Sequence, residues 1–435
     1  MQGKIAKYYI MIKPYRQRIY DKILDRKLRG KGAILIEGAK WCGKTTTAEQ
    51  MAKSVLYMTE PGKVEQNISL ARLNPAILLR GNNPRLIDEW QVAPQLWDAV
   101  RFEADHRNSL GLFVLTGSSV PADMSQVIHS GTGRFGWMKM RTMSLWESGD
   151  SSGDVSLGKL FESPNNIEGV SILNLERLAF LTCRGGWPQA VDMPTDIALD
   201  QAFDYVAAVE ERDISLSDGV RRDKSRTHRI LRSYARHQGT QASYTTIKDD
   251  LSSNESDNFD TDTIASYISA LKRIFVVEDV EAWNPNLRSK TAMRTADTHY
   301  FTDPSIATAA LGLGPNDLLN DLETFGLVFE TLCVRDLRVY ADALQGNVYH
   351  FRDKNGLECD AVVHLRDGRY GLIEIKLGGE EHIKAGANTL KTLASKIDTT
   401  RMKSPSFMMV ITAVGDYAYR REDGVCVVPI GCLKD

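Results

Sequence analysis

Along the first third of the chain, apolar residues come in short unbroken runs that end in glycine or in polar residues. The runs are Ala33–Glu37, Leu86-Ile87 ahead of Asp88, and Gly111–Ser119. Short apolar runs of this kind are typical of strands buried in a parallel sheet. A helical pattern follows the first run, so we expect an α/β domain with a parallel sheet here.

The middle of the chain has mostly helical spacing. From Ile172 to Asp213 the pattern is helical, with a glycine–proline break at Arg184–Val191. Beyond it lie three short helical patterns and two strand-like segments: Thr227–His237, Ser243–Leu251, Thr263–Ile274, Phe275–Trp283 and Thr298–Asp303. Three helices followed by a basic hairpin predict a winged helix, a fold that binds DNA in some proteins and protein partners in others.

The last third combines a helical segment with alternating strands. Phe325–Tyr340 has helical spacing and carries Glu330, whereas Leu357–Leu365 and Arg369–Gly378 alternate as strands do. This alternation brings three side chains toward one edge of a sheet: Asp360, Glu374 and Lys376. Two carboxylates there could hold a divalent metal, and the lysine could steady a water nucleophile or phosphate charge. Carboxylates and lysines at strand ends are also common as plain exposed polar residues.

The strongest motif follows the first strand, where Gly38–Thr45 fits G-x-x-x-x-G-K-[ST] in full. The glycines let backbone amides point at phosphate oxygens, and the helix that follows directs its positive end at the anion. We expect Lys44 to reach the β- and γ-phosphates of ATP and Thr45 to hold Mg²⁺. The predicted nucleotide-binding residues are Gly38, Ala39, Lys40, Trp41, Cys42, Gly43, Lys44, Thr45 and Thr46.

Four further residues complete the predicted ATP site. Asp88, at a strand end, is expected to hold Mg²⁺, and Glu89 to polarise the attacking water. Thr116 could touch the γ-phosphate or the water, although a hydroxyl that satisfies turn amides is about equally expected. Arg134 lies between glycines near a strand start and could serve as an arginine finger for a neighbouring subunit, or be an ordinary surface arginine.

Composition limits where a nucleic acid could bind. The chain has 435 residues, enough for several domains, and a formal net charge of −2, so a nucleic-acid site would have to be a local basic patch. The most basic stretch and the hairpin supply the candidate DNA contacts: Arg221, Arg222, Lys224, Arg226, Arg229, Arg288 and Lys290. Such a run could follow a phosphate backbone or be a solvated helix face.

Cysteine usage and hydropathy bear on localisation. The six cysteines lack C-x-x-C spacing, which argues against a disulfide framework or zinc site and fits a reducing cytoplasm. No segment approaches the roughly 20 apolar residues that would span a bilayer. We therefore expect a cytoplasmic protein without a membrane partner.

The order of the motifs resembles a known family. Gly38–Thr45, "LIDEWQ", "LTGSS", and "GR" followed by "SLWE" resemble the AAA+-like ATPases of bacteria and archaea that carry a C-terminal domain of unknown function. The resemblance implies a P-loop ATPase core over 1–155, a helical lid over 156–218, a winged helix over 219–305, and a PD-(D/E)XK nuclease-like domain over 306–435. The nuclease-like site would consist of Glu330, Asp360, Glu374 and Lys376, with a second divalent metal.

Three functions follow as hypotheses. The first is a Mg²⁺-dependent ATPase, working as a homo-oligomer, that binds or remodels DNA and is coupled to the nuclease-like domain. The second is a metal-dependent DNA endonuclease that ATP regulates. The third is a nucleotide-gated switch that binds a protein partner and does not act on DNA.

Overall fold

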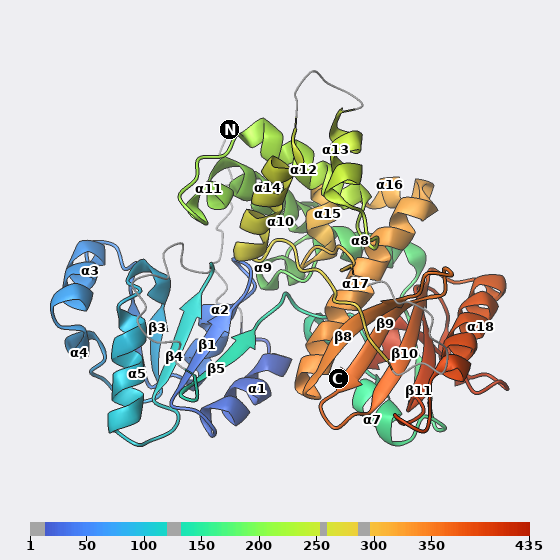
Figure 1. The fold of residues 1–435 in the computed structure, drawn as a ribbon, viewed down its shortest axis with the longest axis horizontal. Coiled ribbons are helices and arrows are strands. Elements are labelled where there is room, and N and C mark those ends of the chain that lie inside the picture. The colour runs from blue at the N-terminus through green and yellow to red at the C-terminus, as the bar shows by residue number, and fades with distance from the viewer. Residues whose placement is uncertain (1–13, 120–131, 253–258, 286–295) are drawn as a thin grey trace, which may run out of the picture.

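The computed structural model describes residues 14–119, 132–252, 259–285 and 296–435. Figure 1 shows two parts with β-sheets side by side, one blue to cyan and one orange to red, beneath a helical part in green and yellow. The fold is α/β and multidomain, as predicted, with a parallel sheet near the N-terminus and a mixed sheet in the C-terminal part. No helix among the described residues is both long and apolar enough to cross a membrane.

The first sheet is parallel throughout, with the strand order β2-β3-β4-β1-β5. The side chains of the interior strand Ala33–Glu37 alternate between two cores: Ile34 and Ile36 face one, and Ala33 and Leu35 face the other. Burial on both faces is the reason that this strand reads as an unbroken apolar run. The strands are β1 (Ala33–Glu37), β2 (Ser54–Tyr57), β3 (Arg85–Asp88), β4 (Phe113–Gly117) and β5 (Phe135–Lys139).

Helices cover this sheet, and a short capped helix leads out of it. In α6, the Ser144 hydroxyl accepts a hydrogen bond from the Glu147 amide while the Glu147 carboxylate accepts one from the Ser144 amide, which satisfies two otherwise unpaired donors. The helices of this part are α1 (Ile19–Leu28), α2 (Lys44–Met51), α3 (Val64–Leu73), α4 (Pro75–Leu78), α5 (Leu96–His106), α6 (Leu145–Ser148) and a 3₁₀ turn, η1 (Trp90–Val92).

Where the winged helix was predicted, the structure has three successive helices, Lys224–Arg236, Tyr244–Ser252 and Thr261–Arg273, followed by an antiparallel pair of short segments. The pair forms through the bridges Val277 to Phe301 and Val280 to Thr298. The loop between these segments, with the predicted DNA contacts Arg288 and Lys290, lies outside the described residues. The helices are α8 (Leu175–Arg184), α9 (Pro188–Val191), α10 (Thr195–Ala208), a π-helical turn η3 (Val209–Asp213), α11 (Ile214–Leu216), α12 (Lys224–Arg236), α13 (Tyr244–Ser252), α14 (Thr261–Arg273), α15 (Pro304–Leu311) and α16 (Pro315–Asn320).

The C-terminal sheet is mixed, with the order β7-β12-β13-β11-β10-β9-β8. Helix α17 (Leu322–Ala343) packs on one face and α18 (Glu380–Lys396) on the other. The strands are β7 (Gly169–Val170), β8 (Gly346–Arg352), β9 (Glu358–Leu365), β10 (Tyr370–Lys376), β11 (Phe407–Thr412), β12 (Tyr417–Arg420) and β13 (Cys426–Pro429), followed by a 3₁₀ turn, η4 (Ile430–Cys432).

Residues 155–170 lie against the C-terminal sheet, although the sequence-based division assigned them to the lid from residue 156. Strand β6 (Val155–Ser156) pairs in parallel with β14 (Leu433–Lys434), and β7 pairs with β12. Between them, α7 (Leu157–Glu162) carries Phe161, whose ring meets that of Phe407 edge to face. Along the sequence, a segment that packs on the C-terminal part therefore comes before the helices of the helical part.

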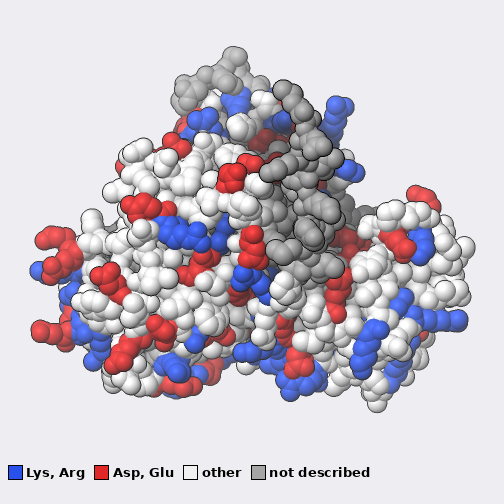
Figure 2. Space-filling model, turned by 180° about the vertical axis from the view of Figure 1, so that it is seen from behind, with Lys and Arg blue, Asp and Glu red and all other residues white. Residues whose placement is uncertain are grey.

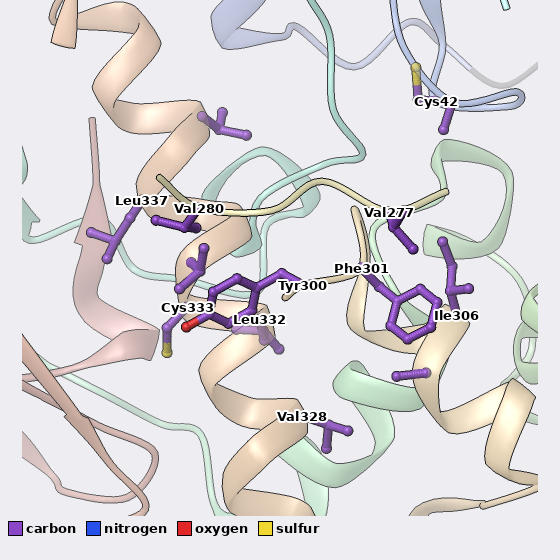
Figure 3. Close-up of a cluster of buried hydrophobic side chains, with 14 of the residues drawn as sticks. Cys42, Val277, Val280, Tyr300, Phe301, Ile306, Val328, Leu332, Cys333 and Leu337 are labelled. Atoms are coloured by element: carbon purple, nitrogen blue, oxygen red, sulfur yellow. The ribbon is translucent and has the colours of Figure 1, made fainter. Parts of the chain in front are cut away.

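Helix α17 runs through the centre of the molecule. In Figure 3, its residues Val328, Leu332, Cys333 and Leu337 lie beside Tyr300 and other apolar side chains of the helical part. Both sides of the helix are covered, because strands β8 to β10 pack on it as well. This explains why its apolar residues extend beyond a single stripe.

A buried ion pair joins the parts of the fold. Asp303 is fully buried and accepts hydrogen bonds from the hydroxyl of Thr142 at 2.6 Å, the amide of Gly186 at 2.9 Å and the guanidinium of Arg335 at 3.1 Å. These donors come from the segment after β5, the turn between α8 and α9, and α17. Arg335 also pairs with Asp336 at 2.7 Å.

We predict that Asp303→Ala destabilises the protein by about 3–5 kcal/mol, because it leaves the Arg335 charge buried with one partner fewer. Asp25→Ala is the matched control, since its pair with Arg29 is exposed and should contribute less than about 1 kcal/mol. Urea unfolding of both variants measures the difference. Equal losses in the two variants would contradict a central role for Asp303.

Candidate functional site

The phosphate loop is fixed by close backbone packing where β1 ends. Gly38 has φ of +152°, and a β-carbon built on it would lie 2.1 Å from the carbonyl oxygen of Met140. Gly43 has φ of +100° and precedes the first turn of α2. Both positions need glycine, the first for space and the second for its left-handed backbone.

Lys44 turns back into its own loop. Its ammonium donates hydrogen bonds to the carbonyl oxygens of Gly38 at 2.9 Å and Ala39 at 2.8 Å. The side chain is buried, so its charge is held inside the loop rather than in solvent. A cation in this place, beside amides at the N-terminus of α2, attracts phosphate.

Asp88 joins the loop to the neighbouring strands. One oxygen of its carboxylate, Oδ1, accepts hydrogen bonds from the hydroxyls of Thr45 at 2.6 Å and Thr116 at 2.7 Å. The parallel register sets Asp88 opposite Thr116. Thr116 was expected at the γ-phosphate or at turn amides, and here its hydroxyl bonds to Asp88.

Glu89 is held beside this group in an uncommon backbone conformation, with φ of +55°. Its carboxylate oxygen Oε2 accepts hydrogen bonds from the Ser118 hydroxyl at 3.0 Å and from the side-chain amide of Gln91. Ser118 and Gln91 carry no predicted role, although both lie in the motifs around Asp88 and Thr116. They fix the direction of the carboxylate toward the cavity.

A cavity of about 690 Å³ opens over the loop, and Lys44, Thr45, Thr46 and Glu89 line it. Its other walls come from distant segments. Pro188 and Gln189 belong to the glycine–proline break at Arg184–Val191, and the remaining residues lie in no motif: Pro14, Tyr15, Arg16 and Asp192. The volume suits a nucleotide. Arg16 and Asp192 form an ion pair at 2.5 Å across one side of it.

The remaining loop residues contact the helical part and the core. Lys40 pairs with Asp213 at 2.6 Å, and the half-exposed ring of Trp41 meets Tyr205 edge to face. Cys42 is buried, and its carbonyl oxygen accepts a hydrogen bond from Arg18 at 2.9 Å. The loop therefore touches the helical part directly, through Lys40 and Trp41.

Arg18 ties three segments together behind the loop. Besides Cys42, its guanidinium contacts Glu147 and the carbonyl oxygen of Arg141, each at 2.9 Å. The side chain is almost wholly buried, and three polar partners compensate for that burial. Arg18 precedes α1 and lies in no motif, so its role could not be predicted from the residue pattern.

Arg134 lies at the start of β5, whereas the phosphate loop follows the end of the parallel strand β1. The two are therefore at opposite ends of the sheet within one chain. The exposed guanidinium pairs with Asp105 of α5.

The structure brings the four predicted nuclease-like residues together. Lys376 Nζ lies 3.2 Å from Asp360 Oδ2 and 2.8 Å from Glu374 Oε2. Glu330 of α17 adjoins this group and accepts a hydrogen bond from the Tyr300 hydroxyl. The other oxygen of Glu374, Oε1, is buried and has no hydrogen-bond partner within the described part of the chain.

The electrostatics of this carboxylate cluster are strongly perturbed. Burial, followed by the charge of Asp360, raises the pKa values of Glu330 and Glu374 to about 8. Burial disfavours the charge on Lys376, but Asp360 and Glu374 raise its pKa above the ordinary value. Among the described residues, no group of three or more His, Cys, Asp or Glu side chains is arranged to hold a metal ion.

The cations predicted to contact DNA have several internal partners. Arg222 is buried and pairs with Asp218 at 2.6 Å, so its side chain supports the fold. Lys224 pairs with Glu211, and Arg226 and Arg229 lie over the ring of Phe259. Arg221 is exposed. Figure 2 shows basic and acidic side chains interspersed over the face seen from behind.

Three family models match successive parts of the chain. An AAA domain matches residues 30–148, and domains of unknown function match residues 175–317 (DUF8612) and 325–433 (DUF4143). Among solved structures, the Walker-type ATPase PABY2304 of Pyrococcus abyssi is similar, with a TM-score of 0.41 and 13% identity, over 69% of this chain and 99% of that chain. No curated protein matches.

We predict that the carboxylate cluster makes stability depend on pH. Glu330 and Glu374 keep their protons to about pH 8 in the folded state but ionise near 4.5 when unfolded, so folding stability falls as pH rises through this window. The variant Glu330→Gln/Glu374→Gln lacks this contribution. The difference in Tm, variant minus wild type, should therefore increase as the pH is raised from 5 to 8. A difference that stays constant over this range would contradict the raised pKa values.

Proposed function

We propose that this P-loop ATPase, with its AAA domain and two C-terminal domains of unknown function, binds and hydrolyses ATP together with Mg²⁺. Lys44 and the loop amides would hold the phosphates. Glu89, directed by Ser118 and Gln91, would orient and polarise the attacking water. The lid contact between Lys40 and Asp213 would report the state of the loop to the helical part.

The residues around Asp88 fit a magnesium ion. Thr45 and Asp88 offer a hydroxyl and a carboxylate, which are the hard oxygen ligands that Mg²⁺ prefers, and their 2.6 Å contact already sets them side by side. When bound, the ion would neutralise charge that develops on the phosphates. Thr116 would act through Asp88, whose Oδ1 it also contacts.

We predict that Glu89→Gln retains ATP binding and lowers the turnover of ATP about 100- to 10,000-fold, because it removes the group that polarises water. Lys44→Ala should lose binding as well. Nucleotide affinity and phosphate release, measured on both variants, separate the two roles. Wild-type turnover by Glu89→Gln would exclude Glu89 as the catalytic residue.

We further propose that the ATPase cycle acts on DNA through the C-terminal part. The observation that carries this is the contact of Lys376 with both Asp360 and Glu374, next to Glu330. Two carboxylates and a lysine at one sheet edge are suited to phosphodiester chemistry. The unpartnered Oε1 of Glu374 is an oxygen ligand available to a second divalent metal, which would activate a water molecule.

A homo-oligomer is part of this proposal. Arg134 stands across the sheet from the phosphate loop of its own chain, so it would reach a nucleotide only in a neighbouring copy. An arginine in that role stabilises charge in the transition state of phosphoryl transfer.

Two other functions remain as alternatives. A DNA endonuclease regulated by ATP would use the same cluster and would need the second metal. A nucleotide-gated switch for a protein partner is favoured by the burial of Glu330 and Glu374, which together with the charge of Asp360 raises the pKa of both carboxyls and so opposes metal binding in this arrangement.

DNA-dependent ATP turnover distinguishes these functions. We predict that one DNA structure among duplex, single-stranded, forked and four-way DNA stimulates wild-type turnover, with Lys44→Ala as the blank. Asp360→Ala and Lys376→Ala should abolish any Mg²⁺- or Mn²⁺-dependent cleavage and leave basal ATP turnover intact. Turnover that is indifferent to all DNA, without cleavage, would favour the protein-partner switch.

A further inference from the structure

A second cleft lies between the AAA domain and the C-terminal part, away from both sites described above. It has a volume of about 370 Å³, and its walls come from α1, β5, and the turns that follow α17 and β9. Four cations line it: Arg26, Lys27, Lys31 and Arg366. Asp342 is the only acid among the lining residues described. Lys139 also lines the cleft but pairs with Glu278 at 3.2 Å.

The four cations have no carboxylate partner among the described residues. Arg26 and Lys31 donate instead to the carbonyl oxygens of Ala343 at 3.5 Å and Gly133 at 3.2 Å. Asp342 offsets only part of their charge, because it also pairs with Arg141 at 2.7 Å. Positive charge is therefore concentrated in the cleft.

The effect of this concentration is visible on Lys27. Burial, followed by the charges of Arg366 and Arg26, lowers the pKa of its ammonium. Like charges held together in this way repel one another, and an anion in the cleft would relieve the repulsion.

An aromatic side chain stands beside the cations. Trp137 lines the cleft and is 46% exposed, although it lies on β5, the edge strand of the first sheet. The rings of Trp97 and Phe135 support it from within the domain. An exposed indole that shares a cleft with cations can bind an unstacked base whose phosphates contact those cations.

We propose that this basic cleft binds single-stranded DNA, with Arg26, Lys27, Lys31 and Arg366 on the phosphates and Trp137 stacked on a base. The proposal rests on the proposed function, because it names the surface through which DNA would engage the ATPase.

Two walls of the cleft lead to the phosphate loop. Helix α1 begins next to Arg18, whose guanidinium holds the carbonyl oxygen of Cys42. Strand β5 continues into Met140, whose carbonyl oxygen packs against Gly38. DNA in the cleft thus contacts elements that position the loop, which gives a route from DNA binding to ATP turnover.

The test measures binding of fluorescein-labelled oligo-dT over a series of salt concentrations. Lys27→Gln/Arg366→Gln should lower the slope of log affinity against log salt by about 1.4, since each phosphate contact to a single strand contributes about 0.7. Trp137→Ala should weaken binding about 5- to 150-fold, the equivalent of about 1–3 kcal/mol of stacking. Arg29→Gln is the matched control at the C-terminal end of α1, because Arg29 pairs with Asp25 and does not line the cleft.

Thermal unfolding checks that the variants are folded, and a footprint on wild type gives a second readout. Acetylation of Lys27, followed by mass spectrometry, should be suppressed by oligo-dT. If inorganic tripolyphosphate suppresses the acetylation of Lys27 and oligo-dT does not, the cleft binds a small anion and the assignment to DNA is overturned.

The outcomes separate this inference from the proposed function. Wild-type binding of DNA with an unchanged slope in Lys27→Gln/Arg366→Gln overturns the cleft and leaves DNA action intact. An absence of DNA binding by wild type overturns both, and Lys27 protection by oligo-dT with a reduced slope supports both.

Discussion

The arrangement of the whole molecule depends on one buried charge pair. Asp303 accepts hydrogen bonds from Thr142 of the AAA domain, Gly186 of the helical part and Arg335 of the C-terminal part. A buried ion is tolerated only while its partners surround it, so these segments cannot separate without exposing or orphaning a charge. The nucleotide cycle must therefore work by small shifts around this point or by motions that leave it intact.

The contacts around β5 show where such shifts can pass. The carbonyl oxygen of Met140 lies over Gly38, and the next residue, Arg141, pairs with Glu278 of the helical part and with Asp342 of α17. Met140 contacts the phosphate loop and its neighbour Arg141 contacts both other parts, so a shift of the loop can pass to both through these two residues. Lys40 gives a second contact, to Asp213 of the helical part.

The sequence was most informative where chemistry is local. Gly38 to Thr45 could be read directly, because phosphate binding needs those residues in consecutive order, and the alternation of β9 and β10 was enough to bring Asp360, Glu374 and Lys376 together. Arg18 and Asp192 could not be found, because their roles arise from tertiary contacts with no spacing rule. A run of polar residues also does not show which of its side chains are buried, as the buried Arg222 illustrates.

The pairing of β6 with β14 has a consequence for how the protein is made. Ser151 donates a hydrogen bond to the carbonyl oxygen of Leu433, 282 residues further along the chain, just before β6 meets its partner strand. During synthesis the AAA domain and its capped exit helix can form early, but this segment must wait, unpaired, until the residues near 433 leave the ribosome. The pairing of β6 with β14 joins residues that are very far apart in the sequence. The two sheet-bearing parts should therefore join among the last events of folding.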